Sequence, residues 1–126
     1  MVSSVRHRSS DAPSRPISAE SVLSGAREYE AHCIACHGGP AVSREPWAEA
    51  LLPVPPYLID VRTRWSRAEL REIVGHGVKM TAMPAWADVL PSDKVDNVVD
   101  FLWGAPTMTT EQFRTIRAYA RSHPDQ

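Results

Sequence analysis

The sequence has no long apolar segment and almost no net charge. Within its 126 residues no run approaches the ~18 apolar residues of a membrane-spanning helix, and the first fifteen residues lack the apolar core of a signal peptide. Fourteen basic and fifteen acidic residues give a formal net charge of −1, so no overall field favours nucleic acid or an anionic membrane surface. We therefore expect one small domain with no spanning helix in this sequence and no nucleic-acid partner.

Cysteine is scarce, and both cysteines lie in one motif. Cys33 and Cys36 are three residues apart and His37 follows directly, which gives the pattern CxxCH. This is the attachment pattern of c-type haem, in which two thiols add to the porphyrin vinyl groups and the histidine binds the iron. We predict one covalent haem c, with Cys33 and Cys36 as its thioether links and His37 as the proximal iron ligand. No cysteine then remains for a disulfide.

Two other uses of a CxxC pair require different surroundings. A thioredoxin-type redox pair is expected in a βαβ unit, and the sequence shows no run of buried strands. A structural zinc site needs four ligands, usually from a second CxxC or an HxxxH pair, and the sequence has neither. His32 is adjacent to Cys33, but neighbouring residues of a helix point in different directions. Haem is therefore the preferred interpretation.

A second iron ligand is expected downstream, on an irregular segment over residues 75–86. Pro84 biases Met83 towards an extended backbone, so this segment can present a thioether across a flat cofactor. Thioether sulfur is a soft ligand that raises the reduction potential of haem iron. We predict Met83 as the distal ligand, with Met80 as the alternative, although filling a core gap is the usual role of methionine. His76 is a weaker alternative, because a helix should end there.

Hydrophobic periodicity predicts an all-α protein that begins with a helix after Ser18. This helix carries Gly25, Tyr29 and Cys33 at four-residue spacing, so the three residues share one face. A glycine in mid-helix is costly and is best explained by another helix that crosses closely at this point. A proline-rich loop over residues 38–60 follows this helix.

Three more helices are expected after the loop. A short one over residues 66–75 begins with a capping box formed by Ser66 and Glu69. The last begins near Thr109, with Gln112 at the matching position of a second capping box. Between them an amphipathic helix follows Pro91-Ser92 and shows apolar residues at helical spacing: Val95, Val98, Val99 and Leu102.

In this order the elements resemble class I cytochromes c. The resemblance covers about residues 20–120 and implies a small fold wrapped around one covalent haem, with an additional C-terminal helix. In that family the first and last core helices cross, so Gly25 is expected against Phe101 or Leu102. The family's sulfur ligand directly precedes a proline, which implies Met83 rather than Met80.

A narrower resemblance concerns the KMTxMPAW segment that ends at Trp86. It is similar to a subgroup of bacterial monohaem cytochromes that an N-terminal helix often ties to the membrane. We interpret residues 1–17 as a flexible tail, 18–105 as the cytochrome c domain and 106–126 as a helical extension. Because c-type haem is attached outside the cytoplasm, we expect a periplasmic protein whose membrane anchor, where one exists, is absent from this sequence.

The resemblance also implies a group that binds the haem propionates before the short helix. Arg62, Arg64 and Trp65 are suitable, since guanidinium and indole donors bind buried carboxylates. Alternatively, Arg62 and Arg64 belong with Arg67 and Arg71 to a solvated cationic face. Three other tryptophans are expected in the haem wall and the core: Trp47, Trp86 and Trp103.

The sequence thus predicts an electron carrier that shuttles single electrons between a redox donor and a redox acceptor, as a monomer. It contains no nucleophile–base pair, acidic dyad or phosphate-binding loop, so an enzyme is not expected. Two alternatives stay open. One is a haem enzyme or gas sensor in which Met83 is displaced by an exogenous ligand. The other is the haem-bearing subunit of a larger oxidoreductase, with the C-terminal extension binding the partner.

Overall fold

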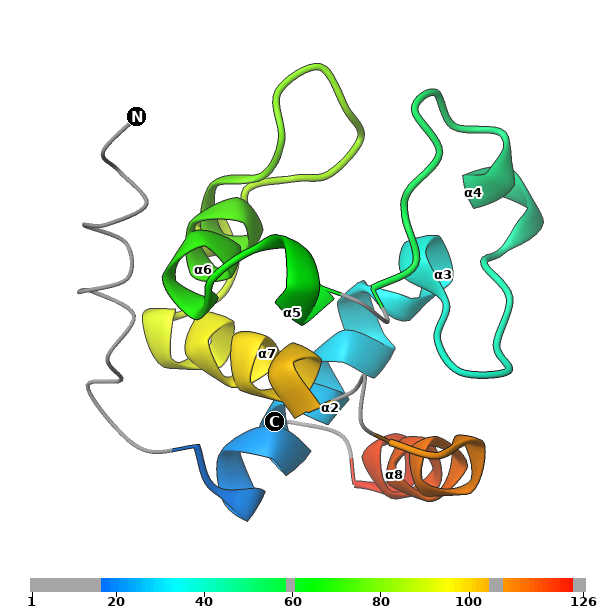
Figure 1. Ribbon diagram of the computed structural model, residues 1–126, viewed down its shortest axis with the longest axis vertical. Helices are drawn as coiled ribbons and strands as arrows, with labels where there is room; N and C mark the ends of the chain where they lie inside the picture. The colour runs from blue at the N-terminus through cyan, green and yellow to red at the C-terminus, as the bar shows by residue number, and fades with distance from the viewer. Residues whose placement is uncertain (1–16, 59–60, 105–107, 124–126) are drawn as a thin grey trace.

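The computed structural model describes residues 17–58, 61–104 and 108–123, and these residues form helices and irregular segments without a strand (Figure 1). The predicted all-α class is therefore confirmed. The expected flexible tail lies outside the described residues, except for Ile17. In chain order the elements are α2 (Ala19–His32), α3 (Ile34–His37), α4 (Pro46–Glu49), α5 (Val61–Arg64), α6 (Arg67–His76), the 3₁₀ helix η1 (Trp86–Asp88), α7 (Ser92–Gly104) and α8 (Thr110–Ser122).

The predicted starts of three helices are confirmed by their caps. The Ser66 hydroxyl accepts a hydrogen bond from the backbone of Glu69, and Thr109 and Gln112 make the equivalent pair at α8. At α2 the cap is Ser18, but Ser21 completes a reciprocal box that the pattern did not predict, because Glu or Gln usually occupies this position. Local sequence therefore determines where these helices begin.

Helices α2 and α7 cross at Gly25, as predicted. A Cβ atom on Gly25 would lie 1.9 Å from the carbonyl oxygen of Asn97 and 2.8 Å from Cβ of Phe101. Phe101 rather than Leu102 is thus the nearest side chain at the crossing. Only a residue without a side chain allows the two backbones to approach this closely.

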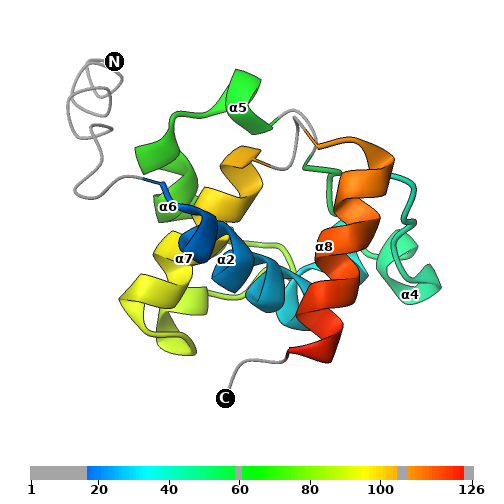
Figure 2. The same ribbon diagram turned by 90° about the horizontal axis from the view of Figure 1, so that it is seen from below.

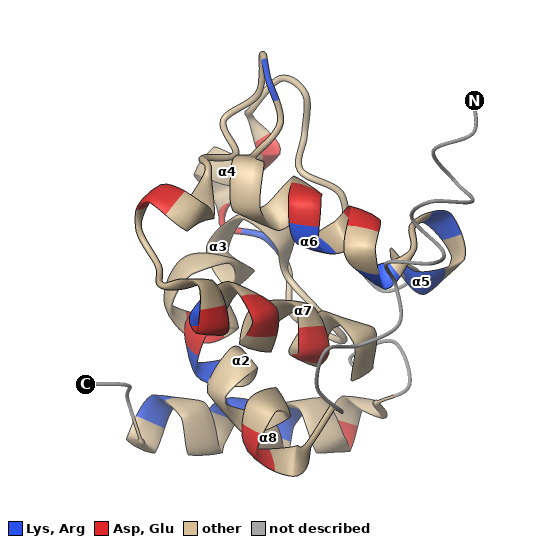
Figure 3. Cartoon of the chain, turned by 90° about the vertical axis from the view of Figure 1, so that its left-hand side faces the viewer, with Lys and Arg blue, Asp and Glu red and all other residues tan. Residues whose placement is uncertain are grey.

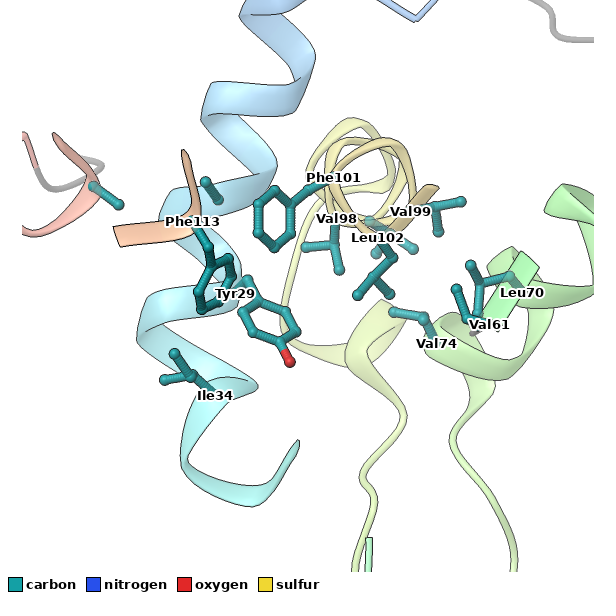
Figure 4. Close-up of a cluster of buried hydrophobic side chains, with 13 residues drawn as sticks. Tyr29, Ile34, Val61, Leu70, Val74, Val98, Val99, Phe101, Leu102 and Phe113 are labelled. Atoms are coloured by element: carbon teal, nitrogen blue, oxygen red, sulfur yellow. The ribbon is translucent and has the colours of Figure 1, made fainter. Parts of the chain in front are cut away.

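The core lies where α2, α6, α7 and α8 meet (Figure 4). The Tyr29 ring packs against Phe101 with ring centroids 5.2 Å apart, and its hydroxyl donates to the carbonyl oxygen of Gly38 at 2.5 Å. The other large buried side chains are mainly aliphatic: Val61, Leu70, Val74, Val95, Val98, Val99 and Leu102. Leu58 and Met83, which lie outside the helices, pack against this core.

The C-terminal helix α8 packs beside α2 (Figure 2). Its Phe113 is 1% exposed and belongs to the core. The guanidinium of Arg117 donates to both carboxylate oxygens of Glu30, at 2.8 and 3.1 Å. The Arg27 guanidinium likewise donates to the Tyr119 hydroxyl at 3.0 Å. The extension is therefore packed into the fold along most of its length.

Two irregular segments stand at the same end of the helical body, over residues 51–58 and 77–85 (Figure 1). The predicted loop over 38–60 is largely confirmed, although it contains the single turn α4, and the Leu52–Pro53 peptide bond is cis. Neither α5 nor η1 was predicted. Both are one turn long, too short to show a hydrophobic period.

Candidate functional site

An apolar cavity of about 440 Å³ lies between the two irregular segments and the helical core. Its volume is in the range of sites that hold a small molecule or cofactor. The core contributes Val74, Val98 and Leu102, and the segment over 51–58 contributes mainly proline and aliphatic side chains. The remaining lining residues include those singled out from the sequence: Cys33, Cys36, His37, Met83 and Trp86.

The CxxCH motif spans the end of α2 and the single turn α3. Cys33 is the C-cap of α2, and its carbonyl oxygen accepts hydrogen bonds from the backbone N–H groups of Cys36 at 3.2 Å and His37 at 3.0 Å. This turn places both thiols and the imidazole at the cavity, while Ile34 is buried in the core on the other side. The structure thus brings the three predicted residues together.

The imidazole of His37 has a defined orientation. Its Nδ1 lies 2.7 Å from the carbonyl oxygen of Pro56, and a carbonyl can only accept, so Nδ1 carries the donated proton. Nε2 therefore keeps a free lone pair, which is the usual arrangement of a metal-binding histidine. Burial lowers the pKa of His37, although the bond to Pro56 opposes the shift. The neutral ring is the form that binds a metal.

Met83 and Met80 lie in contrasting environments. Met83 is partly buried, packs against the core and lines the cavity. Its backbone N–H donates to the Thr81 hydroxyl at 3.2 Å, and this hydroxyl donates to the Val78 carbonyl oxygen at 2.7 Å. Met80 is 95% exposed and lies outside the cavity. Helix α6 ends at His76, as predicted, and this exposed residue pairs with Glu72.

The cavity meets the requirements of a covalently attached haem. It offers two thiols, an imidazole with a free Nε2 and a thioether, within walls that are otherwise largely apolar. The sequence matches the family described as Cytochrome C oxidase, cbb3-type, subunit III over residues 20–102. The chain belongs to this family. A cytochrome c domain implies covalently bound haem c and haem-based electron transfer.

Helix α8 lies beyond the part of this cytochrome c domain that matches the family. No curated protein and no solved structure matches the chain. Among the described residues no helix of the cytochrome is long and apolar enough to span a membrane.

The Cys33 thiol does not resemble the nucleophile of a catalytic redox pair. Burial, with contributions from Glu28 and Cys36, raises the pKa of the free Cys33 thiol to about 12. Reactive CxxC pairs have the opposite shift, because the thiolate is the nucleophile. Within the described ranges, moreover, no cluster of three His, Cys, Asp or Glu side chains is placed to hold a metal.

The segment that bears the Pro56 carbonyl is held by Arg44. The Nε of Arg44 donates to the Pro55 carbonyl oxygen at 2.6 Å, and Nη1 bonds a Glu49 carboxylate oxygen at 2.9 Å. The guanidinium also lies 3.9 Å from the centre of the Tyr57 ring. Arg44 was not predicted from the sequence, since no local pattern marks a contact with a segment eleven residues away.

The residues predicted to bind propionates lie near α5, outside the described lining of the cavity. Arg62 and Arg64 form an exposed cationic pair on this turn (Figure 3). The Arg62 guanidinium lies 5.3 Å from the centre of the Trp103 ring, and that of Arg64 lies 4.8 Å from the Trp65 ring. Their assignment to the propionates stays a prediction.

The larger cationic face is interrupted by acidic partners. The solvated cationic face was predicted to include Arg67 and Arg71. These two residues form ion pairs with Asp100 and Asp96 of α7, respectively. Asp100 is fully buried, so its pair with Arg67 belongs to the packing between α6 and α7.

Of the three other tryptophans, two lie at the cavity or the core as predicted, and one is exposed to solvent. Trp86 lines the cavity and Trp103 packs against the core. Trp47 was wrongly expected in the haem wall or core, because it lies on the outlying turn α4 and is 57% exposed. His32, in contrast, lines the cavity although it was not expected to share the site with the cysteines. The expectation assumed a continuous helix through this point, but α2 ends at His32 and the chain changes direction at Cys33.

Proposed function

We propose that this protein is a single-electron carrier with one haem c whose iron is bound by His37 and Met83. It works in the periplasm as a monomer, between a redox protein that donates and one that accepts the electron. The observation that carries the proposal is the convergence of four groups on one apolar cavity: the thiols of Cys33 and Cys36, the oriented imidazole of His37 and the thioether of Met83.

Each part of the site has a role in this function. The haem, when bound, supplies the one-electron couple. Cys33 and Cys36 hold its edge, and Pro56 keeps the imidazole of His37 in the orientation that ligation requires. The soft sulfur of Met83 raises the reduction potential, and the surrounding aliphatic side chains keep water from the iron.

The polar groups of the cavity support a carrier rather than an enzyme. His32 pairs with Glu28 at 3.4 Å, and the Thr81 hydroxyl is bonded to the backbone of its own segment. Neither forms a nucleophile–base pair with a neighbouring group. We therefore assign these side chains to positioning and propose no substrate chemistry.

The propionates are proposed to meet Arg62, Arg64 and Trp65. Support comes from Arg64, whose Nη2 lies 3.5 Å from the carbonyl oxygen of Tyr57. Tyr57 is followed directly by Leu58, which lines the cavity, so this guanidinium is near its wall. We likewise propose that residues 18–105 form the haem domain, to which residues 106–126 add a helical extension.

A second candidate is the haem-bearing subunit of a larger oxidoreductase. The family's description names an oxidase subunit, which favours an assembly of this kind. Leu52 and Met80 are the most exposed large apolar side chains of the described residues, and each lies on one of the two segments beside the cavity. Such a subunit would sediment as part of a larger complex with its partner subunits, whereas the carrier would sediment as a monomer.

The proposal is tested by optical spectra of the oxidised, reduced and CO-treated reduced protein, beside Met83→Ala and the matched variant Met80→Ala. We expect wild type and Met80→Ala to show the red sulfur-to-iron charge-transfer band and to bind CO slowly. Met83→Ala should lose the band and bind CO rapidly, because the sixth position of the iron opens. A wild-type protein without the band that binds CO readily would contradict the carrier and favour a haem enzyme or gas sensor.

A further inference from the structure

His32 joins the end of α2 to the segment that carries Met83. Its imidazole packs against the Trp86 indole with ring centroids 5.0 Å apart and an angle of 44° between the planes. Both residues line the cavity. His32 is the last residue of α2 and Trp86 is the first of η1, so the contact links two elements that are distant in the sequence.

The position of the His32 ring is set from its other side by Glu28. The Nε2 atom lies 3.4 Å from a carboxylate oxygen of Glu28, one turn earlier on α2. Glu28 is itself buried, and Nζ of Lys94 on α7 lies 3.8 Å from its other oxygen. The imidazole thus lies between the Trp86 ring and a charged pair that joins α2 to α7.

The segment that carries Met83, residues 77–86, is called the methionine segment; Gly77 is its first residue and Trp86 its last. The carbonyl oxygen of Trp86 accepts hydrogen bonds from Val89 at 3.0 Å and Leu90 at 2.8 Å, which fixes the turn after the segment. Gly77 has φ +75°, and a Cβ there would lie 2.8 Å from the carbonyl oxygen of Met83. Among the described residues, Thr81 alone supplies side-chain hydrogen bonds that shape the segment between these ends.

We propose that His32 is a positioning residue that holds the methionine segment, residues 77–86, closed over the cavity through its contact with Trp86. The role of Met83 as the ligand rests on the function proposed above, whereas the contact that holds the segment does not. Aromatic pairs of this kind shift a local equilibrium by about two- to tenfold. Loss of the imidazole should therefore open the segment without unfolding the core.

The experiment compares His32→Ala and His32→Phe with the control His76→Ala in the haem-loaded protein. His76 is a matched control because it also ends a helix, pairs with the glutamate four residues earlier and adjoins the same segment. Hydrogen exchange of the Asp88, Val89 and Leu90 amides, whose bonds close η1, reports opening at Trp86. We expect exchange about two- to tenfold faster in His32→Ala, and wild-type rates in His32→Phe and His76→Ala.

Spectra provide the second readout. His32→Ala should bind CO faster than wild type by a similar factor, and His32→Phe should restore the wild-type rate. Unchanged exchange in His32→Ala, or equally fast exchange in His32→Phe, would overturn the inference. If wild type itself lacks the band, ligation by Met83 is wrong, while the exchange rates still decide the role of His32.

Discussion

Phe113 of α8 lies directly against Gly39, two residues after the histidine of the CxxCH motif. A Cβ atom on Gly39 would come within 2.5 Å of the ring carbon Cζ of Phe113. The same ring stacks on Phe101, with centroids 6.3 Å apart. A helix beyond the family match therefore supports the backbone that follows the two thiols, on the side away from the cavity.

This packing makes α8 a structural part of the domain. Phe113→Ala should lower the free energy of unfolding by about 3–5 kcal/mol, because it leaves a large cavity between α2, α7 and α8. Denaturant unfolding measures the loss, with the exposed Thr115→Ala on the same helix as the control. A loss below about 1 kcal/mol would instead favour α8 as a detachable partner-binding extension.

The crossing of α2 and α7 gives a second prediction. Gly25→Ala should destabilise the protein by about 1–3 kcal/mol, since its Cβ would overlap the Asn97 carbonyl, despite the better helix propensity of alanine. Gly104→Ala is the control, because a Cβ there meets no atom within 4 Å. Thermal unfolding of both variants tests the difference. Equal stability of the two variants would mean that the helices separate at little cost.

Tyr29 provides a prediction about alkaline pH. Its hydroxyl donates to the buried carbonyl of Gly38, and burial raises the pKa of Tyr29 above the value of about 10 found in unfolded chains. The folded state thus keeps this proton longer than the unfolded state. The stabilisation that follows is complete below about pH 10 and is lost as the pH rises further.

Replacement of Tyr29 by phenylalanine tests this dependence. Tyr29→Phe should cost about 1–3 kcal/mol near neutral pH, since the Gly38 carbonyl loses its donor. It should also make the decline of stability above about pH 10 shallower than in wild type. Urea unfolding across this pH range measures both effects, with the more exposed Tyr57→Phe as the control. Parallel pH profiles for wild type and Tyr29→Phe would refute the assignment.

Arg44 should tune the reduction potential through Pro56. Arg44→Lys keeps the charge but loses the Nε donor to Pro55, so the carbonyl that orients His37 becomes less fixed. A weaker bond to Nδ1 makes the imidazole a poorer electron donor to ferric iron. We expect the potential to rise by up to about 60 mV, a tenfold change for a one-electron couple. Potentiometric titration measures it, and an unchanged or lower potential would oppose this role.

A matched control separates this effect from surface charge. Arg114 is exposed and pairs only with Glu111 of its own helix among the contacts of the described residues. Arg114→Lys should therefore leave the potential unchanged.

The parts of this protein that depend on local order could be predicted from the sequence. Ser66 with Glu69 and Thr109 with Gln112 start helices because each pair satisfies backbone groups within one turn. The CxxCH motif predicted that its three side chains lie together for the same reason, since one helical turn brings them to one cavity. Gly25 also predicted the contact between α2 and α7, because a mid-helix glycine is costly unless another helix packs closely against it.

The contacts that hold the site, in contrast, join distant segments and could not be predicted. The bond from His37 to Pro56 joins residues 19 apart, and the contact between His32 and Trp86 joins α2 to η1. Trp47 was misplaced because its aromatic character predicts burial, whereas the position of α4 exposes it. Such contacts arise when distant segments pack together, and no pattern within a few residues encodes which carbonyl or ring will face a given side chain.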